Sequence, residues 1–361
     1  MHTHNLPVTT FYKRLDVYRF IAVFFVMLSH WLGFLQEYVN LGGTGVIMFF
    51  VLSGFLITNS ILAALENKSA PAKVFRVFYI RRFLRIFPLY YLVIFVFYVV
   101  FKDAILIKDL KYYVFYAVNF LVLKIQHWPD HFSHLWSLSA EEQFYLVWPV
   151  LIIPFFSKKN TGLKIICTLV FLLAYLLLSY KKYNTDFFLL NPLYSSLAIV
   201  AGGFLSWHWN YNKDYLLSLR LPRAFPFVMT CYICLCFFTH TYYFYGCFLI
   251  LTITASALLI LYLIDGKKGD PVMLDGFFNN KTLGYLGKIS YGIYVYHNLM
   301  YHLFAMAGFD RRLLHDWSAK GYLVYFLVYP VFYLLATILI SILSWELFER
   351  PINNLKRYFP Y

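Results

Sequence analysis

Residues 19–30 read RFIAVFFVMLSH, an almost unbroken apolar run with Arg19 at one end and His30 at the other. The run lies within a longer apolar segment, 17–36. A stretch of about 20 apolar residues is long enough to cross a bilayer as a helix. This segment is therefore predicted to be a membrane span that carries two ionisable side chains.

The composition of the whole chain agrees with a membrane protein. Of its 361 residues, 61% are hydrophobic and 13% are charged, whereas a soluble domain is about 45–50% apolar and about 25% charged. The net charge of +14 comes from residues in short loops between apolar runs, as topology signals do. We therefore expect contact with membrane lipid and no nucleic-acid partner.

Ten segments are apolar enough to be read as spans. They are 17–36, 45–65, 86–101, 142–156, 163–180, 188–207, 224–240, 243–264, 283–307 and 322–347. A further stretch, 112–125, is short and closed by a lysine, so it is expected to be re-entrant or interfacial.

Loop charges set the expected orientation, because lysine and arginine favour cytoplasmic loops. Ten spans place every strongly basic loop inside, whereas a crossing by 112–125 would put the later ones outside. The expected fold is all-α, a polytopic integral membrane protein with about ten transmembrane helices and both termini cytoplasmic. It is expected to be one domain over 1–361, with a core at about 11–351 and no appended soluble domain.

Arg19 and His30 share one face of the first predicted span. Eleven residues at about 100° each come within about 20° of three whole turns, and the helical rise separates the two by roughly 16 Å. Histidine can act as a base near neutral pH. A histidine that only hydrogen-bonds a neighbouring helix explains the spacing equally well.

The basic segment 78–88 holds Arg81, Arg82 and Arg85. Arg82 and Arg85 lie three residues apart and so on one helical face. Arginine suits bidentate recognition of phosphate. The alternative is a topology anchor that touches lipid headgroups.

The segment 134–145 reads HLWSLSAEEQFY. Ser137 or Ser139 is placed to cap a helix opened by Glu141 and Glu142. A carboxylate near a membrane histidine can also orient that histidine, and capping alone is the alternative. The histidines and aspartate of 127–134 are not expected to bind a metal, because Pro129 disturbs their spacing.

The segment 42–55, GGTGVIMFFVLSGF, combines small residues with apolar ones. Small residues let helices approach closely in lipid. We expect this segment to pack tightly against other helices.

Taken together, these segments resemble the membrane acyltransferase family 3, whose members O-acylate extracytoplasmic glycans and related acceptors. The resemblance rests on Arg19 and His30, GVIMFFVLSGF, the arginines before Pro88, HLWSLSAEEQFYLVWP, GKISYGIYVYH and FERP, in that order. The position of Ile47 is often acidic in the family. Many relatives also carry a C-terminal esterase-like domain, which is not expected here.

The resemblance implies a mechanism in which acyl-coenzyme A, expected to be acetyl-CoA, binds at the cytoplasmic mouth with its phosphates on Arg14, Arg82 and Arg85. Arg19 lies on the same route, His30 is the general base or a transient acyl carrier, and Glu141 orients its imidazole. No tightly bound cofactor or metal is implied. Other candidate site residues are Ser53, His134, Trp136, Ser137, Tyr145, Tyr291 and His297.

The expected function is therefore an O-acyltransferase of the bacterial inner membrane, acting on a glycan or lipid-linked glycan such as lipopolysaccharide O-antigen or exopolysaccharide. A secondary transporter of a lipid-linked sugar or organic anion also explains ten spans with buried polar groups. A non-catalytic scaffold is the third possibility. The residues leave the acceptor, the acyl group and the existence of an acyl-histidine intermediate open.

Overall fold

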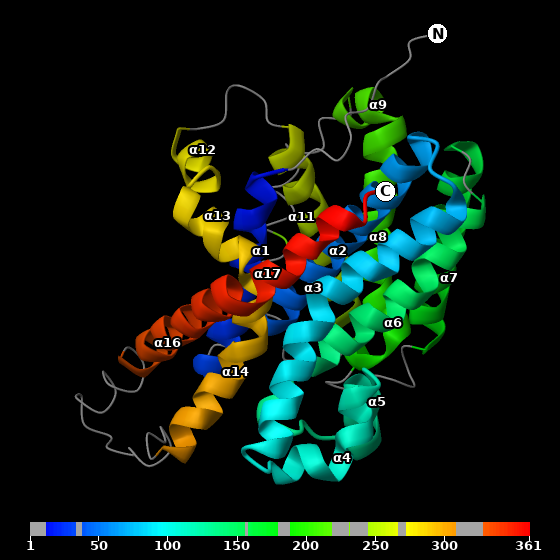
Figure 1. Ribbon diagram of the computed structural model, residues 1–361. Helices are drawn as coiled ribbons and strands as arrows, with labels where there is room; N and C mark the ends of the chain where they lie inside the picture. The colour runs from blue at the N-terminus through cyan, green and yellow to red at the C-terminus, as the bar shows by residue number, and fades with distance from the viewer. Residues whose placement is uncertain are drawn as a thin grey trace.

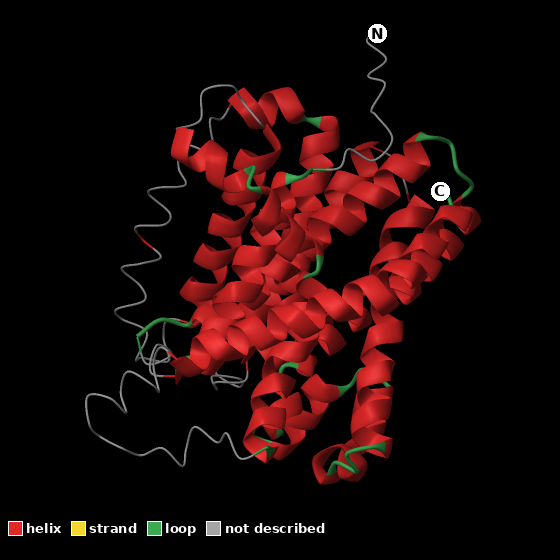
Figure 2. Cartoon of the chain, turned by 60° about the vertical axis from the view of Figure 1, so that its left-hand side comes forward, coloured by secondary structure: helices red, strands yellow, loops and turns green. Residues whose placement is uncertain are grey.

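The computed structural model describes residues 12–33, 38–155, 158–179, 188–218, 231, 245–265, 272–307 and 328–361. Within these ranges the regular structure is helical and contains no strand, as Figure 1 and Figure 2 show. The all-α prediction is confirmed for this part of the chain. The predicted span 224–240 and the start of 322–347 fall mostly outside it.

The helices follow the apolar segments in order. They are α1 (Arg14–Trp31), α2 (Leu41–Glu66), α3 (Pro71–Val99), α4 (Ala104–Val114), α5 (Val118–Ile125), α6 (Leu135–Ile152), α7 (Lys158–Ser179), α8 (Pro192–Tyr211), α9 (Lys213–Ser218), α11 (Tyr245–Asp265), α12 (Val272–Phe278), α13 (Lys281–Lys288), α14 (Ser290–Met306), α16 (Tyr329–Ser344) and α17 (Arg350–Asn354). Short turns of other helix types are η2 (Asp130–Phe132), η3 (Ile153–Phe155), η4 (Phe188–Leu190), η9 (Trp345–Glu349) and η10 (Leu355–Tyr358).

Within the described ranges, four helical stretches are long and apolar enough to cross a membrane: Leu41–Glu66, Pro71–Val99, Gly246–Asp265 and Tyr329–Tyr358. The protein is therefore a membrane protein with several apolar helices. Ten spans and two cytoplasmic termini stay predictions.

The basic loop expected between the predicted spans 45–65 and 86–101 is wrong for most of its length, because α3 begins at Pro71 and carries Arg81, Arg82 and Arg85 inside the helix. A proline at the first helical position favours that early start, and arginine is a good helix former. Pro88 also lies within α3, which membrane helices tolerate because neighbouring groups satisfy the freed backbone.

The predicted serine cap of α6 is also wrong. The helix begins at Leu135, so Ser137 and Ser139 lie in its first turns. Their hydroxyls bond the carbonyl oxygens of His134 at 3.3 Å and Leu135 at 3.1 Å, respectively. Glu141 therefore projects from the body of the helix and does not open it.

Two other predicted segments are each divided in the structure. The stretch 112–125 spans the end of α4 and all of α5, with Tyr116 between them in a left-handed conformation (φ 50°). The predicted span 283–307 breaks at Ile289 into α13 and α14. Both breaks direct short helices to the two ends of the bundle, where α13 and α4 lie in Figure 1.

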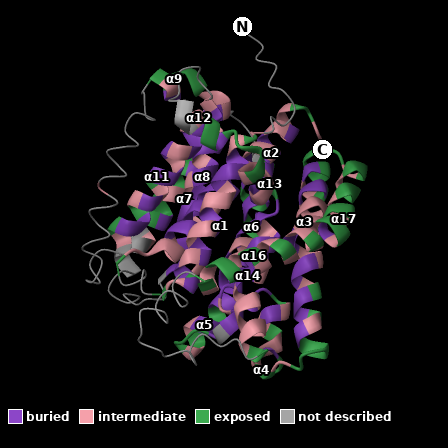
Figure 3. Cartoon of the chain, turned by 90° about the vertical axis from the view of Figure 1, so that its left-hand side faces the viewer, coloured by how far each residue is buried: buried purple, intermediate pink, exposed green. Residues whose placement is uncertain are grey.

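Helix α2 occupies the centre of the bundle and packs against α1 and α8. Its most apolar window is 78% buried, against 17% for that of Tyr329–Tyr358. Figure 3 shows the same contrast between the inner helices and α17. Large apolar side chains such as Phe95 and Leu335 are more than half exposed on the outside, as expected for helices that face lipid.

Glycines permit the contact between α2 and α8. A Cβ atom on Gly54 would lie 1.8 Å from the carbonyl oxygen of Ile199, and one on Gly202 would lie 1.9 Å from that of Val51. The two backbones therefore touch reciprocally. The close packing predicted for segment 42–55 is confirmed.

Replacing Gly202 by Ala should destabilise the protein by about 1–3 kcal/mol, because the new methyl group meets backbone that cannot move aside. Thermal unfolding of the purified protein in detergent would show the loss. Gly284→Ala is the matched control: its added Cβ meets nothing within 4 Å, so it should be neutral or gain up to about 1 kcal/mol. Equal melting temperatures for both variants would contradict the packing account.

Candidate active site

A cavity of about 360 Å³ opens between α1, α2, α3, α6 and α14, with the C-terminal residues at its rim. Its polar lining is dominated by cations. The described lining cations are Arg19, Arg81, Arg82, Arg85 and Lys356, and Glu141 is the one carboxylate among the described lining residues. So many like charges repel one another, and an anionic ligand would relieve that repulsion.

Two arginines of α3, Arg81 and Arg82, are held by aromatic rings and backbone. The guanidinium of Arg82 lies 4.9 Å from the ring centre of Tyr145. That of Arg81 donates to the carbonyl oxygen of Phe359 at 3.0 Å and lies over the ring of Tyr361. Within the described chain, no hydrogen bond or ion pair is found for Arg85. These contacts leave guanidinium donors available to a ligand.

Glu141 is part of a hydroxyl relay on the cavity wall. The hydroxyl of Tyr145 donates to the Glu141 carboxylate. Because that hydrogen is used, the hydroxyl of Ser53, 2.6 Å away, donates to the Tyr145 oxygen. Glu141 thus contacts Tyr145, and the expected contact with His30 is not seen among the described residues.

The ring that contacts His30 belongs to His297. His30 Nδ1 lies 2.8 Å from His297 Nε2, and the two rings stack with centres 4.9 Å apart. The ring of His134 lies edge-on to the ring of His297, with their centres also 4.9 Å apart. His297 and His134 are 0% and 2% exposed, whereas His30 is exposed. His30 is therefore the member of this histidine cluster that a substrate can reach.

The hydrogen bonds define which nitrogen of His30 is basic. His297 Nδ1 lies 2.6 Å from the carbonyl oxygen of Tyr294, which can only accept, so Nδ1 carries the hydrogen. In the neutral ring His297 Nε2 is then an acceptor, and His30 Nδ1 donates to it. This leaves the lone pair of His30 on Nε2, where it can accept a proton.

Tyr294 connects the basic cavity with the histidine cluster. Its side chain lines the cavity, its carbonyl oxygen fixes His297, and its hydroxyl bonds the carbonyl oxygen of His134 at 2.8 Å. The same hydroxyl lies 2.6 Å from that of Ser137, another lining residue. Tyr294 and Ser137 thus form a hydroxyl layer on the cavity wall, and Tyr294 also contacts the histidine cluster.

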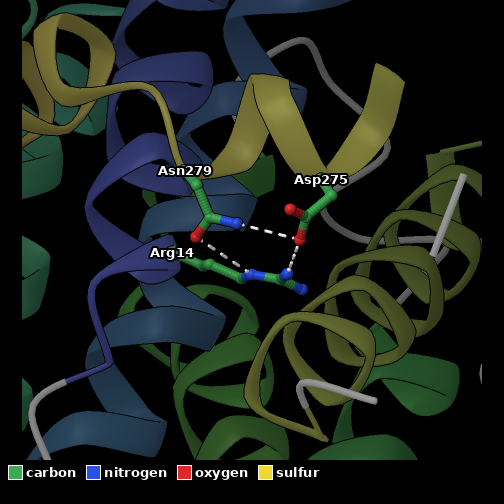
Figure 4. Close-up of polar contacts among 3 residues, drawn as sticks. All are labelled: Arg14, Asp275 and Asn279. Carbon is green, nitrogen blue, oxygen red and sulfur yellow. Dashed lines mark hydrogen bonds and ion pairs between the residues drawn. The ribbon is translucent and has the colours of Figure 1, made fainter. Parts of the chain in front are cut away.

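Arg14 lies apart from the lining residues. Its guanidinium pairs with Asp275 of α12 and approaches Asn279 at 3.4 Å, as Figure 4 shows. Asn279 also donates to Asp275 at 2.9 Å. The observed contacts tie the start of α1 to α12, and the expected role of Arg14 as a phosphate ligand stays a prediction.

The remaining expected residues lie in or behind the cavity wall. Ser53, Ser137, Tyr145 and Tyr291 line it, and Tyr291 donates to the carbonyl oxygen of Ile86 at 2.6 Å. Trp136 is buried and packs edge-on against Phe50.

Sequence reasoning did not select Tyr294, Arg81 or Lys356 as site residues. Tyr294 lies inside the quoted segment GKISYGIYVYH, three residues before His297, so helical spacing was a usable signal. Arg81 lies in the same basic segment as Arg82 and Arg85, but of these three the resemblance implies a phosphate-binding role only for the other two. Lys356 gave no signal, because only the folded tail brings it to the cavity.

Comparison with protein families matches residues 12–346 to the acyltransferase domain. The chain belongs to this acyltransferase family. Residues 12–346 contain every element of the site except the C-terminal rim, so the basic cavity and the histidine cluster are features of an acyltransferase domain.

The chain has curated relatives in several bacteria. It is 31% identical to a putative peptidoglycan O-acetyltransferase of Bacillus subtilis over 78% of this chain and 47% of the relative. It is 30% identical to a peptidoglycan O-acetyltransferase of Listeria monocytogenes over 97% of this chain and 58% of the relative. A putative O-acetyltransferase of Staphylococcus aureus is 26% identical over 94% of this chain and 57% of the relative. The chain thus spans about half the length of these relatives, and no solved structure matches it.

Exposure predicts how the three clustered histidines react with diethyl pyrocarbonate, which modifies accessible, unprotonated imidazoles. In the folded protein His30 should be carbethoxylated well before His297 and His134, as read by peptide mass spectrometry. After unfolding in detergent and urea, all three should react alike. Equal labelling of His297 and His30 in the folded protein would contradict the arrangement described.

Proposed function

We propose that this chain is the membrane part of an O-acyltransferase that moves an acyl group, expected to be acetyl, from cytoplasmic acyl-coenzyme A to a hydroxyl of an extracytoplasmic glycan. One observation carries the proposal: a strongly basic cavity is connected, through Tyr294 and then His297, to an exposed, hydrogen-bonded histidine, His30. Two ligands, one anionic and one bearing a hydroxyl, suit these two regions.

The names of the relatives support acetyl as the transferred group and favour peptidoglycan as the acceptor glycan. The other surface glycans considered from the sequence are alternatives to it. Coenzyme A is made and used in the cytoplasm. The basic cavity would therefore open on the cytoplasmic side of the bacterial inner membrane.

The donor would bind in the basic cavity. The cavity volume of about 360 Å³ is at the low end of small-molecule sites, which span about 300–1,000 Å³. The cavity therefore suits a part of the coenzyme. Arg82 and Arg85 would hold phosphate oxygens, and Arg19 would extend the cationic surface toward the histidine cluster. Bidentate arginine–phosphate pairs supply both orientation and affinity.

Glu141 would help to position the arginines that bind the acyl donor in the basic cavity. Its carboxylate accepts from Tyr145, and the ring of Tyr145 lies against the guanidinium of Arg82. The relay of Ser53, Tyr145 and Glu141 would therefore keep Arg82 turned toward the cavity, with Glu141 offsetting part of its charge.

The acceptor hydroxyl would meet His30 from the opposite side. Nε2 of His30 takes the hydroxyl proton while the acceptor oxygen bonds the thioester carbonyl carbon. The carbon–sulfur bond then breaks, and the proton returns from His30 to the coenzyme thiolate. His297 assists by accepting the Nδ1 hydrogen bond, which fixes the orientation and tautomer of His30. Attack by His30 itself, forming an acyl-imidazole, is the alternative route.

Replacing His30 by Ala should reduce acyl transfer by about 10²–10⁴-fold, the usual contribution of a general base. The assay is transfer of radiolabelled acetyl from acetyl-CoA to isolated peptidoglycan by the full chain in proteoliposomes. Acceptor-dependent release of free coenzyme A would distinguish an enzyme from a transporter. His127→Ala, in an exposed loop, is the control and should leave the rate unchanged. Normal turnover by His30→Ala at an unchanged melting temperature would remove the central claim.

Replacing Arg85 by Ala should raise the KM for acetyl-CoA about tenfold or more, since a charge-assisted hydrogen bond contributes about 1.5–3 kcal/mol. Direct binding of coenzyme A, measured by calorimetry, should weaken in parallel. Arg76→Ala is the matched control, because Arg76 is exposed on the same helix and outside the cavity lining. Unchanged coenzyme A affinity in Arg85→Ala would count against the proposed donor site.

A further inference from the structure

A second group of chemically versatile side chains lies away from the basic cavity. Asp103 follows the end of α3, His131 lies in η2, and His302 lies in α14. One ligand atom of each lies within 4.8 Å of the others. This region is the end of the bundle that carries α4 and α5, opposite the C-terminus in Figure 1.

We propose that Asp103, His131 and His302 form a binding site for a divalent transition-metal ion of the zinc class. Two imidazoles and one carboxylate are ligands that Zn²⁺ accepts, and three protein ligands leave a fourth position for water. The proposal is independent of the transfer reaction described above.

The distances fit such an ion. His131 Nε2 lies 3.0 Å from Asp103 Oδ2, and His302 Nε2 lies 4.0 Å from the same oxygen. In a tetrahedral site with bonds of about 2.0–2.1 Å, neighbouring ligand atoms are roughly 3.4 Å apart. The observed separations bracket that value. Because the two imidazole rings are stacked within 11° of parallel, one ring has to turn out of the stack for both nitrogen lone pairs to point at one ion.

The surroundings hold two of the three ligands, Asp103 and His131, in place. Asp103 caps α4 through Oδ1, which accepts from the backbone N–H of Leu106 at 2.9 Å, so Oδ2 is the oxygen turned toward the imidazoles. The side chain of Asn298 donates to the carbonyl oxygen of His131 at 2.9 Å. The Leu106 bond to the carboxylate is the kind of outer contact that fixes the orientation of a metal ligand, whereas the Asn298 bond holds the backbone of His131.

The ligands are also largely removed from solvent. The side chains of His131, Asp103 and His302 are 2%, 11% and 23% exposed. The two imidazole rings stack with centres 3.6 Å apart, and both direct Nε2 toward one carboxylate oxygen. A proton on one ring would satisfy one histidine–carboxylate contact, whereas a divalent ion is shared by all three groups.

A bound ion would join three separate elements near the histidine cluster. α14 carries both His302 and His297, and His134 follows η2 closely in the chain. Sequence spacing pointed away from this site, because it grouped His131 with its neighbours in 127–134. Only the folded chain brings Asp103 and His302 to it.

The test is titration of the full chain in detergent with Co²⁺, after removal of metal with a chelator. We expect one equivalent to bind, with the intense visible absorption of tetrahedral Co²⁺, and to be displaced by Zn²⁺. Asp103→Asn keeps the cap of α4, because asparagine caps as well as aspartate, yet removes the charged ligand. Its Co²⁺ affinity should fall more than the roughly 10–100-fold that loss of an outer-shell partner costs.

Two further variants complete the test. His302→Gln should weaken Co²⁺ binding as Asp103→Asn does, with elution volume and helical circular dichroism unchanged. His127→Gln is the matched control, a nearby histidine outside the cluster, and should bind as the unaltered protein. Absence of saturable Co²⁺ binding by the unaltered protein, or equal affinity in all variants, would overturn the proposal.

Discussion

The backbone contact of α2 with α8 is the constraint on which the rest of the bundle depends. Lipid gives helices no hydrophobic reason to associate, so close van der Waals packing must hold them together. Gly54 and Gly202 let the two backbones touch, and Gly45 similarly admits the carbonyl oxygen of Ala22 in α1. With α2 fixed between α1 and α8, the positions of Arg19 and His30 at the two ends of α1 are fixed as well.

That arrangement gives the two ends of α1 different roles, with a cation at one end and a proton acceptor at the other. The first turns of α1 contribute Arg19 to a cavity rich in guanidinium groups. The last turn delivers His30 to two buried histidines. A rigid helix is a suitable support for two groups that have to keep a constant separation, because its length changes little when side chains or ligands move.

The features of the fold and the site that depend on residues close together in the chain could be predicted from the sequence. The shared face of Arg19 and His30 follows from helical periodicity, and the tight packing at Gly54 follows from residue size. The partner of His30 could not be derived in this way, because His297 arrives from a distant segment and Glu141 was the more familiar orienting group. Helix starts at Pro71 and Leu135 were missed because charged and polar residues there suggested loops, whereas the helices extend past the apolar core. The grouping of Asp103 with His302 depends on tertiary contacts alone.

The hydroxyl layer of Tyr294 and Ser137 has a consequence for membrane permeability. Under the proposed function the two regions open to opposite sides of the membrane, where a continuous path of water between them would short-circuit the proton gradient. Here the hydroxyls are engaged with each other and with the carbonyl oxygen of His134, so neither has an unused hydrogen to offer an ion that loses its water. An uncharged thioester arm would lose little hydration in the same place. The layer would therefore discriminate by the cost of dehydration, passing a neutral chain while the bilayer stays sealed to charge.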